Sequence, residues 1–590
     1  MILFHYSIHY YIYRHRAFLT MAVCLCLLCS SLSTMAQNKK AKNEKVYLDH
    51  ADELRYDQYV KMDVQIVKGN VQFRYGDTRL WCDSAYFNQN RNTFHAFGHV
   101  RMKKSKGITL TCSRAFYDGD ADYVQAREKV VVTQPGSSLH CDSLDYNVAT
   151  EYANFFGGNG GKLQKGNTIV TSREGEYYFN AHDANFYGDV VMKSPKYTIN
   201  TDNLRYNTDT EVAHVTGESV VYGRNGEVVH TNDGYYYSKT DRMELNGRST
   251  ITSKERDVEG DYINYNSTTG ESEGRGNAVY HDKIGDRVIT GDSLSYNDKT
   301  KIGEGRGHVV YTDRKNRNSL IADYVHYTES SAIAHGNPLV KDFSQKDTLF
   351  MHSDTIRMEA FHVNTDSVYR KVHCYKNVRM FRTDIQAVCD SLVGYSRDSC
   401  VVLYRDPIAW NGARQILGDS IKIFLNDSTV REAFVYGHAL AIEQMNDREH
   451  YNQISSSSMR AHFKDGKLRL NEAIGNVLSI YYSVDEKDST ILFLDDMKSD
   501  TLRMYLSEER KMEKIWVSKP DGVLYPLTQV PPGKDKLPGF AWFDYVRPLD
   551  KNDLFRRVGK GDNVKLKSEK AVFLPRQIIS TKPEGHRNVK

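Results

Sequence analysis

The feature that most constrains this chain is a short sequence element that recurs about every 30 residues. Residues 291–297, Gly-Asp-Ser-Leu-Ser-Tyr-Asn, are one copy, in which an acidic residue precedes an apolar-x-aromatic triplet. Successive copies at Asp261, Asp292, Asp323 and Asp354 are 31 residues apart. A fixed period of this length marks a repeat architecture, in which each unit buries its apolar face only against its neighbours. The remaining copies lie at Asp83, Ser113, Asp142, Asp202, Asp390, Asp419 and Asp500.

A second marker runs in phase with the first, as a glycine two residues before a valine. The clearest examples are Gly69, Gly98, Gly188 and Gly307. Glycine at a repeated position indicates a turn with positive φ or a close approach of two backbones. The residue before each Asp is nearly always small, which predicts a bend where neighbouring strands press together. We expect the Asp side chain to bond backbone N–H groups two residues further on.

The composition favours strands throughout the repeat region. The chain has 40 tyrosines, which suit strands, and only 12 prolines, which cannot donate to a ladder. Eight of those prolines lie between residues 520 and 583. We therefore predict an all-β protein built from repeats of about 30 residues, with a Pro-rich C-terminal tail. Each repeat should comprise two or three short strands joined by turns.

These signals divide the chain of 590 residues into four segments. Residues 1–36 read as a signal peptide, because two arginines precede an apolar run and Thr-Met-Ala then resembles a cleavage site. The alternative is an uncleaved anchor. Residues 37–345 hold the regular repeats, residues 346–517 a second and more divergent repeat region, and residues 518–590 a Pro- and aromatic-rich tail or cap. A repeat array escapes the size limit of a single core.

Three cysteines, Cys82, Cys112 and Cys141, share one repeat phase. In an oxidising compartment they can form a disulfide, and they can equally be small buried thiols that fill the tight bend. A metal site is disfavoured because neither a CxxC motif nor paired histidines accompany them. The sequence therefore predicts no cofactor.

Several chemical interpretations fail on spacing. The glycines of Gly303-x-Gly305-x-Gly307 recur one repeat earlier at Gly274-x-Gly276, and no helical pattern follows to cradle a phosphate. The recurrent Asp residues occupy equivalent places, whereas a catalytic carboxylate pair needs two different environments. We therefore expect no enzymatic activity. The net charge of +4, with both signs interspersed, gives no support to nucleic-acid binding. Asp-Ser/Thr-aliphatic triplets also look like acceptors for bacterial O-glycosylation, although bend chemistry explains them without it.

The repeated Gly-x-Val and Asp-Ser-Leu-x-Tyr-Asn elements, with the export signal, resemble the OstA/LptA family of lipopolysaccharide transport in its long, OstA-like form. The resemblance covers residues 46–345 well and residues 346–517 loosely. It implies a periplasmic protein that has no cofactor. Its elongated, twisted and open β-jellyroll would enclose an apolar groove for lipid A acyl chains. It also implies partners among the other Lpt components, including an LptD-like outer-membrane protein, reached by edge-strand pairing, and self-association by the same edges.

If such a groove exists, the apolar-x-aromatic triplets are its candidate walls. The competing interpretation is that these side chains fill a closed core against each other. Two other classes of protein remain, a structural or adhesive cell-envelope repeat protein without lipid cargo and a polysaccharide-active β-helix enzyme. The groove candidates are Leu144, Tyr146, Leu204, Tyr206, Ile263, Tyr265, Leu294, Tyr296, Val325 and Tyr327.

Overall fold

The computed structural model describes residues 45–56, 63–104, 107–363, 365–426, 429–485, 490–509 and 512–558. The predicted signal peptide, residues 1–36, lies outside the described residues. So does the end of the predicted tail, residues 559–590. Among the described residues, no helix has the length and hydrophobicity needed to cross a membrane.

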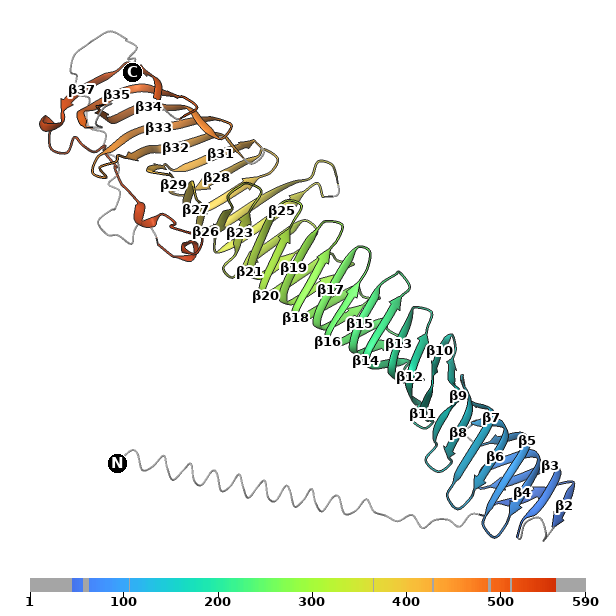
Figure 1. The fold of residues 1–590 in the computed structure, drawn as a ribbon. Helices are drawn as coiled ribbons and strands as arrows, with labels where there is room; N and C mark the ends of the chain where they lie inside the picture. Colours follow the sequence, from blue (N-terminus) through green and yellow to red (C-terminus); the bar gives the residue numbers. More distant parts are fainter. Residues whose placement is uncertain are drawn as a thin grey trace, which may run out of the picture. The chain divides into compact units, whose positions relative to one another are not determined.

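The chain forms two compact units, Met1–Gly161 and Lys162–Lys590, and strand β9 contains the boundary between them. The division of the repeats near residues 345 and 517 stays a prediction. Both units consist of antiparallel hairpins stacked in sequence order, which confirms the all-β jellyroll fold (Figure 1). The strands of the first unit are β1 (Tyr47–His50), β2 (Glu53–Tyr56), β3 (Gln65–Tyr75), β4 (Thr78–Asn88), β5 (Thr93–Lys103), β6 (Thr109–Asp118), β7 (Tyr123–Gln134), β8 (Ser137–Asn147) and β9 (Tyr152–Lys165).

The second unit continues the same hairpin order. Where a strand is interrupted at its bend, one neighbour pairs with both pieces, as β21 does with β22 and β23. Its first strands are β10 (Thr168–Ser172), β11 (Glu174–Tyr178), β12 (Asp183–Lys193), β13 (Tyr197–Asn207), β14 (Val212–Gly223), β15 (Val228–Tyr237), β16 (Arg242–Thr252), β17 (Arg256–Asn266), β18 (Glu271–Asp282), β19 (Arg287–Asn297), β20 (Ile302–Asp313), β21 (Asn318–Tyr327), β22 (Ser331–His335), β23 (Leu339–Asp342), β24 (Leu349–His352) and β25 (Thr355–Phe361).

The later elements of the second unit complete the ladder and begin the tail. They are β26 (Tyr369–Arg382), β27 (Ile385–Tyr395), β28 (Cys400–Tyr404), β29 (Ile408–Asn411), β30 (Arg414–Leu417), β31 (Ser420–Asn426), β32 (Thr429–Gln444), β33 (Tyr451–Lys464), β34 (Lys467–Val484), β35 (Ile491–Leu506), β36 (Met512–Ser518), β37 (Asp521–Pro526) and the short 3₁₀ helices η1 (Leu527–Gln529), η2 (Asp544–Val546) and η3 (Asp553–Phe555).

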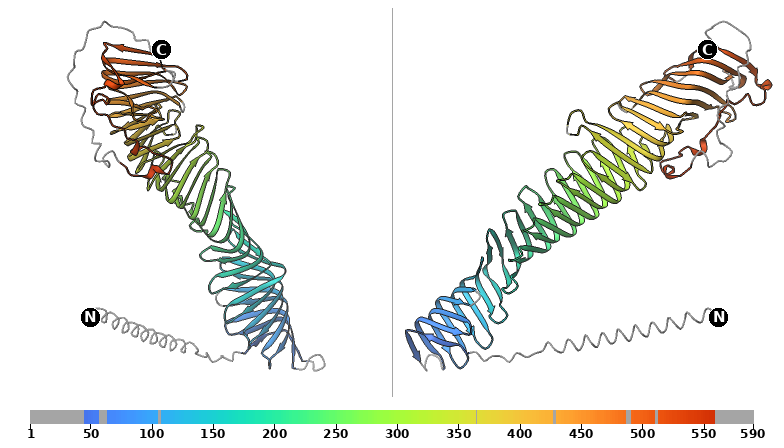
Figure 2. Two further views of the ribbon diagram at one scale, coloured as in Figure 1. Left: turned by 60° about the vertical axis from the view of Figure 1, so that its left-hand side comes forward. Right: turned by 180° about the vertical axis from the view of Figure 1, so that it is seen from behind.

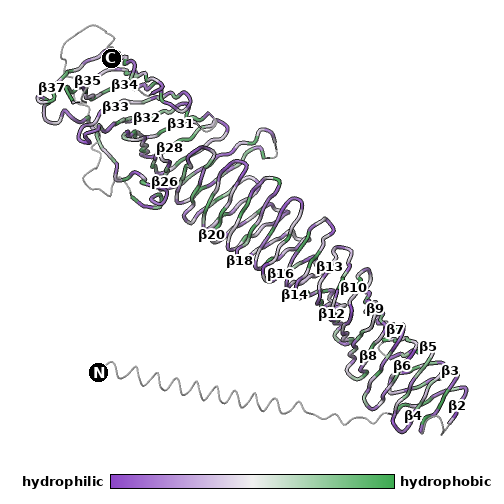
Figure 3. The backbone as a smooth tube through the Cα atoms, in the orientation of Figure 1, coloured by the Kyte–Doolittle hydropathy of each residue, from purple (hydrophilic) through white to green (hydrophobic). Residues whose placement is uncertain are grey.

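Each long strand bends in the middle, and the bend changes which residues face inward. In β13, Ile199 and Thr201 are buried before the bend, and Leu204 and Tyr206 after it. The two residues between these pairs are exposed, and the register shifts at the same place. The bend therefore folds every strand into two arms whose apolar sides face each other. Along the strands the colour alternates between hydrophobic and hydrophilic, as this packing requires (Figure 3).

The bend is built from the two sequence markers together. The Asp of one strand lies over the Gly of the next, so that a Cβ on Gly307 would stand 2.1 Å from Oδ2 of Asp292. That carboxylate bonds the residue after the glycine, and Nδ1 of His308 lies 3.0 Å from it. Its observed partner is thus a side chain on the neighbouring strand. Gly307 has φ of 67°, which confirms the predicted positive φ.

The small residue before the Asp points into the bend, as predicted. At Gly418, a Cβ would approach Cγ1 of Val435 to 2.5 Å. Where the residue carries a hydroxyl, it donates to the carbonyl two residues on, as Ser353 does to Thr355 at 3.1 Å. Cys82, Cys112 and Cys141 occupy this position as free, buried thiols. They lie on alternate strands, roughly 10 Å apart at the normal strand spacing, which is too far for a disulfide.

We expect Gly307→Ala to destabilise its bend more than Gly247→Ala. Both positions have positive φ, at 67° and 72°, but only at Gly307 does an added Cβ meet an Asp, since Gly247 has open space. The difference should be about 1–3 kcal/mol. Hydrogen exchange of the amides at residues 289–310, compared with residues 243–262, measures it. Equal protection in the two variants would show that the Asp–Gly contact contributes nothing.

The hairpin turns form two rows, one along the free edge of each arm (Figure 2). We call the gap between the two rows the mouth. In the first unit a buried ion pair spans it: Nζ of Lys104 lies 2.8 Å from Oε1 of Glu151 and donates to the carbonyl of Val148 at 2.9 Å. Both side chains are nearly inaccessible, at 11% and 5%. The first unit is thus closed at this place.

Removing one member of this pair should be costly, since it strands a buried charge. We expect Glu151→Ala to lower the free energy of unfolding of the first unit by about 3–5 kcal/mol. Replacing both residues, in Lys104→Met/Glu151→Leu, should recover most of that loss because no charge then remains buried. Chemical denaturation followed by circular dichroism tests this. A double variant as unstable as the single one would contradict the explanation.

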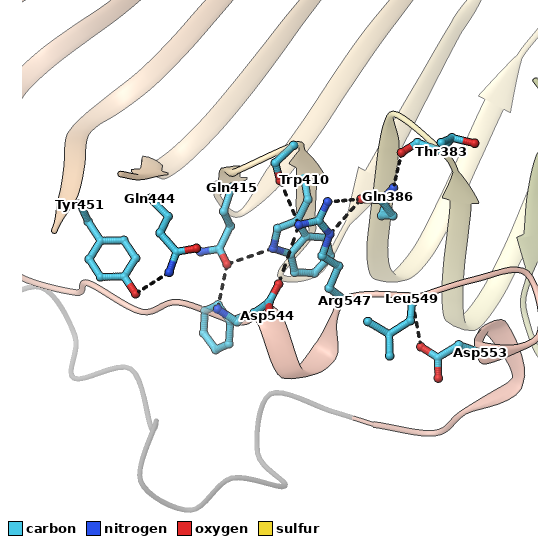
Figure 4. A network of polar contacts seen from close by, with 12 residues as sticks. Thr383, Gln386, Trp410, Gln415, Gln444, Tyr451, Asp544, Arg547, Leu549 and Asp553 are labelled. Atoms are coloured by element: carbon cyan, nitrogen blue, oxygen red, sulfur yellow. Dashed lines mark hydrogen bonds and ion pairs between the residues drawn. The ribbon is translucent and has the colours of Figure 1, made fainter. Parts of the chain in front are cut away.

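The tail crosses the outer face of one arm as a strap, defined here as residues 527–556. Two buried glutamines, Gln415 and Gln453, hold it by its backbone, and a third, Gln386, accepts hydrogen bonds from Nε and Nη2 of Arg547 at 2.9 and 2.6 Å (Figure 4 shows Gln386, Gln415 and Arg547). Gln415 donates to the carbonyl of Ala541 at 2.7 Å and accepts from the N–H of Phe543 at 2.8 Å. Gln453 likewise donates to the carbonyl of Asp535 and accepts from the N–H of Leu537. Between the glutamines, apolar side chains such as Trp410 cover the strap.

Candidate functional site

The interior of the second unit is hollow between β13 and β26. There it encloses a cavity of about 1320 Å³, which we call the chamber. Drug-sized ligands occupy pockets of roughly 300–1,000 Å³, so the chamber suits a larger molecule. Several inner side chains of β16 to β21, such as Met243, Tyr280 and Tyr296, are half-buried there, whereas the corresponding side chains of β12 to β14 are fully buried.

The ten groove candidates divide between the chamber and the closed interior. Ile263, Tyr265, Leu294, Tyr296, Val325 and Tyr327 line the chamber. Leu144, Tyr146, Leu204 and Tyr206 are no more than 2% exposed and do not line it. All ten point inward. The groove interpretation therefore describes the part of the chain around the chamber, and the closed-core interpretation describes the part that holds the other four residues.

The residue that faces each apolar-x-aromatic triplet from the next strand determines whether the interior is hollow or closed. Leu204 pairs with Phe186, which is completely buried and fills the space between the arms. Leu294 pairs instead with Gly274 on one side and Gly305 on the other. These glycines leave empty the volume that Phe186 occupies. The chamber is therefore the stretch of the array where the inward positions of the return strands carry glycine, serine or alanine.

The glycines also determine how the tyrosines lie. A Cβ on Gly303 would stand 2.0 Å from the ring of Tyr327, so the ring rests directly on the glycine backbone. Sequence reasoning considered Gly303 and Gly305 only as a phosphate loop and missed this role. The signal was present, because the equivalent inward positions in earlier repeats hold Phe94, Phe155 and Phe186.

The chamber wall combines aliphatic and tyrosine side chains. On one arm, Val258, Ile289 and Leu320 alternate with their cross-strand partners Tyr280 and Tyr311, and three more tyrosines line the other arm; we call these five tyrosines the tyrosine row. Burial raises the pKa of every tyrosine in that row, so their hydroxyls stay protonated and the wall stays neutral at physiological pH. The row comprises Tyr265, Tyr280, Tyr296, Tyr311 and Tyr327.

One chamber residue, Tyr236, has an unsatisfied polar group. The side chain is 3% exposed, and no described residue accepts or donates a hydrogen bond at its hydroxyl. Burial raises its pKa strongly. An unsatisfied buried hydroxyl costs about 1–3 kcal/mol, which a polar atom of a bound molecule would offset.

Packed side chains bound the chamber at both ends. On the N-terminal side, the hydroxyls of Tyr197 and Ser238 lie 2.5 Å apart across the mouth, and Lys196 forms an ion pair with Asp241 beside them. On the C-terminal side, a core that includes Ile356, Cys374 and Leu392 fills the space between the arms. A long ligand therefore has a closed wall at each end.

A side chain added at Gly274 should fill the chamber without disturbing the fold. Its φ is not positive and an added Cβ meets only Ala278, at 3.3 Å. We expect Gly274→Leu to reduce binding of the apolar probe N-phenyl-1-naphthylamine severalfold, measured by fluorescence. Gly158→Leu, at a site in the first unit with no neighbour within 4 Å, is the matched control. Unchanged probe binding in a folded Gly274→Leu variant would place the apolar site elsewhere.

Two sequence families match the first half of the chain. Residues 43–202 match the model for OstA-like proteins, and residues 169–271 match the model for LptA and LptD N-terminal lipopolysaccharide transport proteins. No curated protein sequence matches the chain. Among solved structures, LptH from Pseudomonas aeruginosa, an LptA-homologous periplasmic component of lipopolysaccharide transport, is 14% identical. The match covers 26% of this chain and 82% of LptH with a TM-score of 0.15, too low to support a structural argument.

Proposed function

We propose that this chain is a periplasmic lipopolysaccharide-transport protein that shields lipid A acyl chains during transfer to the outer membrane, because residues 43–202 and 169–271 match the models of OstA-like and LptA/LptD N-terminal transport proteins. The observation that carries the proposal is the chamber, an apolar space of about 1320 Å³ inside a fold that is elsewhere closed. The family matches favour a transport role over catalysis.

The chamber meets the main energetic demand of lipid transfer. Each methylene exposed to water costs about 0.8 kcal/mol, so a lipid with several acyl chains cannot cross an aqueous compartment uncovered. Aliphatic side chains such as Ile263 and Leu294 provide the apolar cover. The neutral tyrosine row and the unsatisfied hydroxyl of Tyr236 provide hydrogen-bonding groups for the polar part of an amphiphile.

Edge-strand pairing remains our proposal for contacts with other Lpt components, including an LptD-like outer-membrane protein, and for self-association. The first unit offers β1 and β2, and β3 is the one strand among the described residues with which they pair. All four residues of β2 are exposed. Such an edge presents unpaired backbone groups that accept a strand from a partner.

The structural or adhesive alternative applies best to the first unit. Its interior is closed by stacked rings, with the centroids of Phe73 and Phe94 4.3 Å apart and those of Phe94 and Tyr117 5.2 Å apart. A segment with so dense a core has no room for a lipid. The first unit therefore serves as an extension or a connection in our proposal, and the cargo site lies in the second unit.

In-cell photo-crosslinking tests the proposal. A photoreactive residue at Tyr265 or Tyr296 should form lipopolysaccharide adducts, because both side chains line the chamber. The same residue at Ser293, on the opposite face of β19, should form none. Tyr146 is a second control, since its side chain is buried in the closed first unit. Absence of adducts at Tyr265 and Tyr296 in folded, exported protein, or equal adducts at Ser293, would count against lipid in the chamber.

A further inference from the structure

Two arginines of the chamber approach it from different arms. Arg287 begins β19, in the row of turns that also contains residues 313–318. Arg370 lies near the start of β26, in the register of the opposite row, where it pairs with Ala360. Both side chains line the chamber, each close to the hairpin turns of its own arm.

Tyr311 and Arg287 lie on neighbouring strands, since Arg287 pairs with Asp313, two residues after Tyr311 on β20. The Tyr311 hydroxyl is 3.5 Å from Oδ2 of Asp313, and Arg370 lines the same chamber from the opposite arm. Burial raises the pKa of Tyr311, and the positive charges of Arg287 and Arg370 both oppose that shift. The phenol is therefore a further donor on the wall that both arginines line.

Neither guanidinium is committed to a strong internal partner. Arg287 is half exposed, and its Nε lies 3.4 Å from Oδ2 of Asp313. That carboxylate is already held by Asn316, whose backbone and side-chain nitrogens both donate to it at 2.8 Å. Arg370 is exposed, and none of the described carboxylates pairs with it. Both arginines are therefore available to an added anion.

The closed ends of the chamber leave the mouth as the route for a ligand. The ion pairs that span the mouth, Lys196 with Asp241 and Arg256 with Asp298 at 3.5 Å, lie on its N-terminal side. Arg287 and Arg370 lie beyond them, toward the C-terminal side. An amphiphile entering sideways would place its acyl chains against the aliphatic wall and leave its polar head between these arginines.

We propose that Arg287 and Arg370 bind the phosphate of a phosphorylated amphiphile whose acyl chains occupy the chamber, and that this ligand enters and leaves through the mouth between them. The proposal rests on the proposed function and adds the chemical class of the head group and its anchoring residues. A phosphate oxygen set can accept from both guanidinium groups at once and would join the two arms.

The test compares one lipid with and without its phosphates, using the full chain. Wild-type protein should bind bisphosphorylated lipid A at least about tenfold more tightly than the same lipid after enzymatic dephosphorylation. Arg287→Gln/Arg370→Gln should abolish this preference while leaving the affinity for the dephosphorylated lipid unchanged. Arg275→Gln/Arg306→Gln is the matched control, because those arginines pair with Glu273 and Glu304 on the outer face. Circular dichroism verifies that each variant is folded.

The possible results separate the two proposals. If wild-type protein binds both lipids equally, or the double variant keeps the preference, the head-group site is wrong and the chamber function survives. If neither lipid binds, both proposals fail. A third measurement uses inorganic phosphate as a competitor. It should displace bisphosphorylated lipid A only at concentrations far above those of the lipid. Competition by phosphate at lipid-like concentrations would identify a free anion as the ligand and overturn the proposal.

Discussion

The contact between a carboxylate and a glycine, which recurs at many of the bends, is the interaction on which the rest of this architecture depends. At Asp292 and Gly307 it fixes three things at once: the left-handed backbone of the glycine, the place where the strand folds, and the change of inward-facing register. Repetition of that contact along the chain makes each rung superimpose on the last. A single shifted bend would turn the apolar residues of one arm toward water.

Because the bends fix the positions of the strands, the side chains between the two arms can vary along the chain. Phe186 and Phe155 close the interior in one stretch, and Gly274 and Gly305 open it in another, within the same antiparallel hairpin order. The array is therefore a scaffold on which a cavity is made by leaving side chains out. This contrasts with a uniform groove, since here the cavity has two ends.

The fold could be predicted from the sequence because its signals are local and repeated. The period of the Asp residues, the in-phase glycines and the scarcity of proline all follow from the geometry of one hairpin. The chamber could not be located in the same way, because its volume depends on pairs of residues on neighbouring strands. Tyr206 and Tyr296 belong to the same motif, yet one faces Ala184 with Phe186 beside it and the other faces Ser272 and Gly303. Arg287 and Arg370 are 83 residues apart and lie in no motif, so only the folded arms relate them.

The strap has a consequence for the order in which the protein is made. Its residues leave the ribosome after every strand that they cover, so Trp410, Leu440 and Ile442 stay exposed until synthesis is nearly complete. Gln386, Gln415 and Gln453 meanwhile lack their hydrogen-bond partners in the strap. A chain that ends early would thus expose a partly apolar, partly polar surface that a full-length chain covers. Proteases and chaperones recognise such surfaces, and the strap would let them distinguish finished molecules from truncated ones.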